Sequence, residues 1–399
     1  MLRTLLLAAA ALPVVVTAAA AAETEPLRWA DVAAAIDRDP RFASSRAASV
    51  AARAGIDVAS AVPNPEIEAT LGRGKAREGD ATRNEWDLSV AVPLEWLARR
   101  GPRIAAARAE TAAADAESAA LRREVALELR RLYVDAAYQQ SLAATLALTE
   151  EQVATLATLI GRRVQSGEAR PVEVPRIEIE LERVRGERLQ SEAERDVALA
   201  QLSSWLARTV RRVEPPAPTP IPPSLGTETH PRIRAAEAQL EAARAEVAAA
   251  RRERVPAFSV GAFYASELDR SAAGVTLSTE LPLWNWNGPQ LARAKARADG
   301  RAAAAEAARR ELAGAAAQLR SACERSTADA ERHAGRIVPR AEESARTLER
   351  SFELGEANLI DVIDARRVLL EARRAALASA RQRELDCGTS YIVSGQEIP

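Results

Sequence analysis

The sequence is poor in the residues that build wide globular cores and catalytic centres. Aromatic residues make up 4% of the 399 residues, and the chain holds one methionine, two histidines and two cysteines. Alanine, arginine, glutamate and leucine dominate instead, a composition typical of long helices and coiled coils. We therefore expect extended helices that pack side by side rather than one compact core.

The scarce residues also fail to form any site for chemistry. His230 and His333 lie far apart, and the sequence holds neither a glycine-rich phosphate loop nor a nucleophile motif. Neither Cys323 nor Cys387 has a second ligand at metal-binding spacing. The 55 basic and 56 acidic residues alternate along the chain and leave no nucleic-acid footprint. The sequence thus gives no support to an enzyme, a cofactor, a bound metal or a nucleic-acid partner.

Long apolar runs are confined to the N-terminus. Residues 1–22 begin with a positive segment at Arg3, continue with an apolar stretch from Leu5 to Val16 and end in small residues, which predicts a cleaved signal peptide and export. No later segment approaches the roughly 18 consecutive apolar residues that a transmembrane helix needs. If the exported chain crosses a membrane, it must do so with strands.

Landmarks recur along the chain at a spacing of roughly 190 residues, which indicates a duplication. Both copies contain a helix opened by an X-Pro-Arg triplet, two short alternating segments, a long helical pattern opened by Gly-Pro, a glycine break and a further helix. The paired landmarks are Pro40 and Pro231, Pro65 and Pro256, Gly101-Pro102 and Gly288-Pro289, and Gly167 and Gly355. We predict a first repeat over residues 23–213, an extended proline-rich linker over 214–226 and a second repeat over 227–399.

The short alternating segments predict strands with one apolar and one polar face. Ile67, Ala69 and Leu71 alternate with Glu66, Glu68 and Thr70, and the same pattern follows in residues 85–96 and, less strictly, in 258–264 and 274–284. Such segments are typical of transmembrane barrels, in which tryptophans lie at the membrane interface. The candidates for that position are Trp86, Trp96, Trp284 and Trp286. Two ordinary half-buried hairpins that cap a helical bundle would show the same alternation.

A membrane location would require several copies of the chain. Four strands cannot close around a pore, and open sheet edges are not tolerated in lipid. Three protomers would supply twelve strands.

The duplicated layout, the "PNPEI" of residues 63–67, the "LPLWNWNG" of residues 281–288 and the two glycine breaks together resemble the TolC family of outer-membrane efflux channels, and within it the CzcC-like branch of heavy-metal and cation efflux. The resemblance implies a mainly α fold with a small transmembrane β portion. It also implies a homotrimer with a twelve-stranded β-barrel in the outer membrane and an α-helical tunnel in the periplasm.

The implied function is passive conduction in a tripartite efflux system. An inner-membrane RND-type pump and a periplasmic adaptor would hand over the substrates, for which metal cations are our first choice. A multidrug or type I secretion channel is the alternative within the family. A soluble periplasmic coiled-coil adaptor or scaffold is the alternative of another class.

The resemblance also assigns roles to the two glycine breaks. They would be the hairpin turns at the periplasmic tip, where the adaptor docks, namely Ser166, Gly167, Glu168, Leu354, Gly355 and Glu356. Asp361 and Asp364, and more loosely Glu173, would form cation-selective rings at the aperture. Carboxylates near a helix N-terminus are also stabilised there without any role in transport.

The same topology gives the cysteines a geometric interpretation. Cys323 and Cys387 lie at similar distances on either side of the second turn, so in antiparallel helices they would lie at similar heights. A disulfide and a pair of buried thiols are both compatible with this position.

Overall fold

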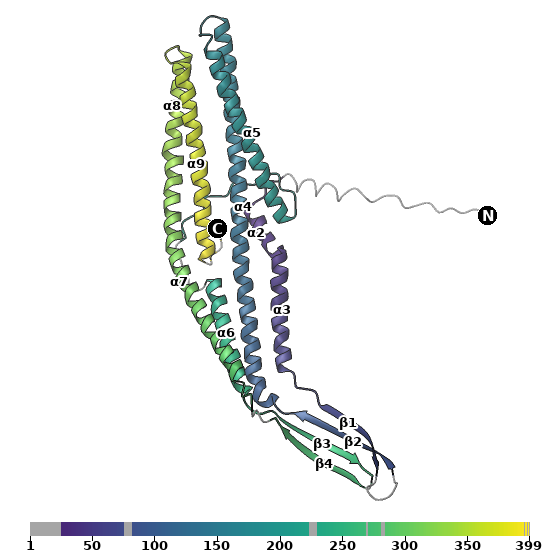
Figure 1. Ribbon diagram of the computed structural model, residues 1–399. Coiled ribbons are helices and arrows are strands. Elements are labelled where there is room, and N and C mark those ends of the chain that lie inside the picture. The colour runs from purple at the N-terminus through teal and green to yellow at the C-terminus, as the bar shows by residue number, and fades with distance from the viewer. Residues whose placement is uncertain are drawn as a thin grey trace, which may run out of the picture. The chain divides into compact units, whose positions relative to one another are not determined.

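The computed structural model describes residues 25–75, 82–222, 230–268, 270–280, 284–394, 396 and 398 (Figure 1). The described chain is mainly helical and contains one four-stranded sheet, as predicted. The signal peptide predicted at residues 1–22 lies outside the described residues. None of the described helices combines the length and the apolar character that a membrane span requires.

The chain forms two compact units, and each of them takes segments from both predicted repeats. We call the first the helical unit; it combines Met1–Asp39, Arg122–Thr227 and Ala313–Pro399. We call the second the sheet unit; it combines Pro40–Leu121 and Glu228–Leu312. The long helices α4 and α7 contribute residues to both units.

The helical unit contains two long antiparallel hairpins (Figure 1). The first hairpin is made by the later part of α4 (Trp96–Gln165) and by α5 (Glu173–Leu206). The second is made by the end of α7 (Gly288–Arg332), the π-helical turn η2 (His333–Ile337), α8 (Val338–Glu353) and α9 (Leu359–Val393). Two short elements near the start of the chain, α2 (Trp29–Ala35) and the 3₁₀ turn η1 (Ile36–Arg38), complete the unit.

Two of the predicted helix boundaries differ in the structure. Helix α4 begins at Trp96, and Pro102, which we expected at its start, lies inside it. Pro102 has no backbone N–H and therefore removes one hydrogen bond near the N-terminus of α4. The helix continues through this position. In the second copy the helix does begin at Gly288, but the run toward Gly355 is interrupted by η2 just before Pro339, because a proline cannot donate the next helical hydrogen bond.

The sheet unit holds all four strands. Its helices are α3 (Pro40–Ser60), α6 (Pro231–Arg252) and the first parts of α4 and α7. The strands are β1 (Glu66–Lys75), β2 (Thr82–Pro93), β3 (Phe258–Ser266) and β4 (Ser271–Thr279). They pair antiparallel in the order β1-β2-β3-β4, so β1 and β4 are the two edges of the sheet among the described residues.

The strand register separates the side chains into one apolar and one polar face. Ile67 pairs with Val90, Val90 with Ala262, and alternate positions along each strand share a face. The apolar face carries Ile67, Leu71, Trp86, Leu88, Val90, Val92, Val260, Tyr264, Val275 and Leu277. The opposite face carries Glu66, Glu68, Thr70, Asp87, Ser89, Thr276 and Ser278. Leu71 is 84% exposed and Val275 79%, so the described part of the chain leaves this apolar face uncovered.

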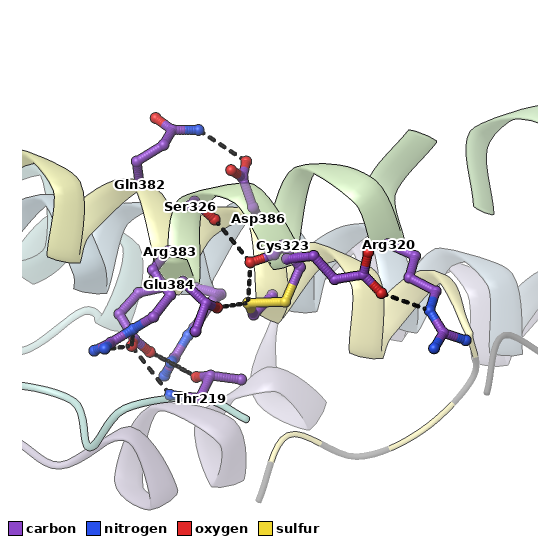
Figure 2. The surroundings of a disulfide bond; sticks show 12 residues. Thr219, Arg320, Cys323, Ser326, Gln382, Arg383, Glu384 and Asp386 are labelled. Carbon is purple, nitrogen blue, oxygen red and sulfur yellow. Dashed lines mark hydrogen bonds and ion pairs between the residues drawn. A yellow bond between two sulfur atoms is a disulfide. The ribbon is translucent and has the colours of Figure 1, made fainter. Parts of the chain in front are cut away.

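A disulfide and a buried ion pair link helices α4, α7 and α9 of the helical unit (Figure 2). Cys323 of α7 and Cys387 of α9 are fully buried and form a disulfide, with their Cα atoms 4.7 Å apart. On α9, Glu384 accepts a 2.9 Å bond from Arg130 of α4, and both side chains are buried. The backbone N–H and the hydroxyl of Thr219 also donate to Glu384, at 3.1 and 2.6 Å. Residues 214–222 of the predicted linker form neither helix nor strand, and Thr219 ties this segment to the buried side chains of Arg130 and Glu384.

Candidate functional site

The two glycine turns have the same backbone geometry. Gly167 has φ of 79° and Gly355 has φ of 80°, in the left-handed region that glycine adopts without a side-chain clash. In each turn the residue after the glycine donates to a carbonyl five residues earlier, Glu168 to Arg163 at 2.8 Å and Glu356 to Ser351 at 2.8 Å. These bonds form the Schellman arrangement that ends a helix. Both breaks are thus true hairpin turns.

An apolar cluster joins the two hairpins near these turns. It contains residues of α4, α5, α8 and α9, namely Val153, Leu156, Ile160, Ile177, Val184, Phe352, Leu359, Val362 and Ile363. On α4, α5 and α9 the residues that form this cluster or pack against it recur at spacings of three and four positions, whereas α8 contributes Phe352 alone. The two hairpins therefore share one core at the end that carries the turns.

Arg163, which the sequence analysis did not single out, links the two turns directly. Its guanidinium donates to the backbone carbonyls of Phe352 and Glu353, both at 3.2 Å, and lies 5.0 Å from the centre of the Phe352 ring. The last carbonyls of a helix have no partner within the helix, so a cation there is favourable. One hairpin thus caps the end of α8 in the other.

Asp361 and Asp364, the predicted aperture residues, are both exposed at the start of α9. The Asp361 carboxylate accepts a 3.2 Å hydrogen bond from the backbone N–H of Asn358, and the two residues form a capping box. Asp361 therefore stabilises the helix start, as the second interpretation of these carboxylates expected. Its exposure leaves the carboxylate open to solvent as well.

Glu173, the third predicted aperture residue, is 8% exposed in the single chain. Its carboxylate pairs with Arg170 at 3.2 Å, and it lies at the start of α5. Glu173 occupies the position in the first hairpin that Asp361 occupies in the second, at the same distance from the turn glycine. The two carboxylates differ in their partners, since Glu173 pairs with the guanidinium of Arg170 and Asp361 accepts from a backbone N–H.

An acidic residue missed by the sequence analysis connects α5 to α9. Glu180 is 4% exposed and accepts hydrogen bonds from Arg183 on its own helix and from Arg367 on α9. Farther from the turns, Glu187 of α5 pairs in the same way with Arg374 of α9. The signal for Glu180 was present in the sequence, since it interrupts the apolar stripe formed by Ile177 and Val184.

The surroundings of Glu180 keep its carboxylate charged. Burial by itself would raise the pKa of Glu180, but the hydrogen bonds and charges of Arg183 and Arg367 outweigh it and lower the pKa below its ordinary value. The contact between α5 and α9 is therefore an ion pair at neutral pH.

The four predicted interfacial tryptophans all belong to the sheet unit. Trp86 lies on the apolar face of the sheet, with its ring centre 5.3 Å from that of Tyr264. Trp284 is 93% exposed and Trp286 56% exposed, just after the end of β4. Trp96 is half-buried at the first position of α4.

The described residues contain no group of three or more His, Cys, Asp and Glu side chains that could hold a metal ion. Carboxylates that are spread along helices and strands can attract cations without retaining them.

Proteins of known structure or function are similar to this chain in sequence and in fold. The cobalt-zinc-cadmium resistance protein CzcC of Cupriavidus metallidurans is 25% identical over 333 residues, which is 80% of this chain and 78% of that protein. The solved structure of CusC matches with a TM-score of 0.78 at 16% identity, covering 92% of each chain. The outer membrane protein VceC of Vibrio cholerae matches with a TM-score of 0.76 at 19% identity, covering 92% of this chain and 96% of VceC.

The sequence profile of the family described as outer membrane efflux protein matches residues 32–208 and 223–386. These two segments include both glycine turns, all four strands and the residues of the shared core. The chain belongs to the outer membrane efflux protein family.

Proposed function

We propose that this outer-membrane efflux protein works as a homotrimeric channel that passively conducts metal cations, which an inner-membrane RND-type pump and a periplasmic adaptor hand over. It carries out no catalysis, and its part in the tripartite system is to provide the path through the outer membrane. The two hairpins extend into the periplasm as the wall of a tunnel.

The geometry of the sheet is the observation that supports a trimer. In the described chain the sheet has an uncovered apolar face and two edge strands, β1 and β4, that each pair on one side only. Backbone groups at such edges must find partners in lipid. Three copies related by a threefold axis would pair each β4 with the β1 of a neighbour and close twelve strands around a pore.

The proposed cargo rests on two supports. CzcC, whose similarity covers 80% of this chain, is a cobalt-zinc-cadmium resistance protein. In addition, Asp361 and Asp364 are exposed near the turn of the second hairpin, and three copies of each would form acidic rings that favour cations. The adaptor would dock on the two turns, at Ser166, Gly167, Glu168, Leu354, Gly355 and Glu356, of which Leu354 is a 65% exposed apolar side chain.

Metal accumulation in cells tests the cargo. Deletion of this channel from its host should raise intracellular cobalt, zinc or cadmium after metal challenge, and the wild-type chain should restore the lower level. The variant Asp361→Asn/Asp364→Asn should restore it less well, whereas Glu331→Gln/Glu371→Gln removes two exposed charges away from the turn and should restore it fully.

The multidrug and secretion channels of the same family remain the alternative cargo class. Unchanged metal levels, together with accumulation of an organic dye such as ethidium in the deletion strain, would contradict the metal proposal and support a drug channel. The soluble adaptor or scaffold, our alternative of another class, is decided against by the family to which the chain belongs.

A further inference from the structure

The helices and strands of the sheet unit meet at four junctions, at residues 55–65, 94–108, 249–256 and 284–297. Hydrogen bonds hold these junctions together at one end of the sheet. Arg99 donates to the carbonyl of Val255 at 2.8 Å, Arg100 to that of Ser60 at 2.9 Å, and Arg254 to that of Trp286 at 3.0 Å. We call this set of four segments the junction collar.

The junction collar is strongly basic in a chain that is nearly neutral. It holds ten basic residues and three acidic ones, a net charge of +7, whereas the whole chain carries −1. Six of the arginines are exposed and have no carboxylate partner among the described residues: Arg103, Arg108, Arg251, Arg252, Arg254 and Arg293. Positive charge is therefore concentrated, and left unneutralised, where the sheet ends.

The helix dipole explains only part of this charge. Arg251 and Arg252 lie in the last turn of α6, where a cation is favourable. Arg103 and Arg293, in contrast, lie near the starts of α4 and α7, and neither helix has an acidic residue in its first turn. Positive charge near a helix start gains nothing from the dipole, so the dipole does not account for these two arginines.

Exposed aromatic side chains accompany the charge. Trp284 is 93% exposed and Trp286 56% exposed, and both belong to the junction collar. The apolar face of the sheet begins beside them with Val92, Val260 and Leu277. Tryptophan prefers the boundary between hydrocarbon and head groups, and arginine can reach from there toward phosphate.

We propose that the junction collar binds the head groups of anionic phospholipids in the periplasmic leaflet of the outer membrane. The helices lie in the periplasm and the sheet in the membrane, so their junction lies at the level of this leaflet. The arginines contact the phosphates, the tryptophans lie among the upper acyl chains, and together they fix how deep the sheet sits in the bilayer.

Tryptophan fluorescence in proteoliposomes tests this proposal. The purified protein is reconstituted in phosphatidylcholine, with brominated phosphatidylglycerol or brominated phosphatidylcholine as the quencher, and the relative association constant of the two lipids is measured. We expect a preference for phosphatidylglycerol that falls in 1 M NaCl, where charges are screened within about 3 Å. Replacement of both Trp284 and Trp286 by phenylalanine should remove much of the lipid-dependent quenching.

The matched variants assign the preference to the junction collar. Arg103→Gln/Arg251→Gln/Arg252→Gln/Arg293→Gln should lose up to about fivefold of preference per arginine. The control Arg336→Gln/Arg340→Gln/Arg346→Gln/Arg350→Gln removes the same charge from exposed positions of the helical unit and should keep the preference. Equal quenching by both lipids in the wild type, or an equal loss in the two variants, would overturn the proposal. The salt experiment needs no variant: if the collar variant does not insert, a preference for phosphatidylglycerol that persists unchanged in 1 M NaCl overturns the proposal.

Discussion

Arg367 Nε of α9 lies 3.0 Å from Glu180 Oε2 of α5, which joins the two hairpins across 187 residues of sequence. The Glu180 side chain is 5% exposed and that of Arg367 is 47% exposed. The carboxylate therefore depends on its two arginines, whereas Arg367 can also interact with water. Loss of the negative charge on Glu180 should weaken the contact between the hairpins more than loss of one arginine.

The ion pair makes this contact sensitive to acid. Because the pKa of Glu180 is lowered on folding, its stabilisation is present above the ordinary value of 4.5 and is lost as the pH falls through the lower value of the folded protein. Glu180→Gln should cost about 2 kcal/mol of unfolding free energy at pH 7 and should flatten its dependence on pH below 4.5.

Denaturation of the detergent-solubilised protein, followed by circular dichroism at several pH values, measures this effect. Glu182→Gln is the matched control, since Glu182 is exposed and pairs only with Arg185 on its own helix among the described residues. We expect a change within about 0.5 kcal/mol for the control. An equal acid response in the wild type and Glu180→Gln would rule out a role for this carboxylate.

Arg163 should hold the two turns together through the carbonyls of Phe352 and Glu353. Arg163→Met keeps the apolar stem and removes the two hydrogen bonds, so it should cost about 1 to 3 kcal/mol. It should also speed amide hydrogen exchange near residue 355 with little effect around the disulfide. Arg162→Met, at the exposed neighbouring position, serves as the control. Unchanged exchange at the second turn would show that Arg163 does not link the hairpins.

The turn glycines should resist substitution. Gly167→Ala and Gly355→Ala place a side chain at φ near 80°, which costs about 1 to 2 kcal/mol each. Gly314→Ala has open space around it inside α7 and should instead stabilise that helix by about 0.5 to 1 kcal/mol. The melting temperature should therefore fall for Gly167→Ala and Gly355→Ala and rise for Gly314→Ala. A change in the same direction for all three variants would contradict the assignment of left-handed turns.

The disulfide should contribute substantially to stability. It closes a loop of 64 residues, for which the chain-entropy model gives about 4 kcal/mol. Cys323→Ser/Cys387→Ser, or treatment of the denatured wild type with dithiothreitol before refolding, should lower the melting temperature. Dithiothreitol should leave the double variant unchanged. A melting temperature that is the same with and without reductant would show that the bond contributes nothing.

Local patterns predicted much of this fold. The turn at Gly355 and the faces of β1 and β2 follow from single-residue chemistry, namely the left-handed conformation of glycine and the alternation of strands.

Other features depend on the packing of distant segments, which no local pattern encodes. Glu180 and Arg367 meet only because two hairpins share a core, and Arg130 reaches Glu384 from a separate helix. The burial of Glu173 was not predicted. It depends on how the nearby Arg170 side chain folds back to pair with the carboxylate, which the sequence pattern does not encode. The start of α4 at Trp96 was missed because a Gly-Pro pair normally begins a helix, whereas here it lies within one.

The ion selectivity of the reconstituted protein tests the proposed cation channel most directly. In a planar bilayer with a tenfold KCl gradient, the reversal potential of the wild type should have the sign of cation selectivity, and Asp361→Asn/Asp364→Asn should move it toward zero. An anion-selective wild-type pore, or a reversal potential that the substitution leaves unchanged, would contradict the proposed acidic rings.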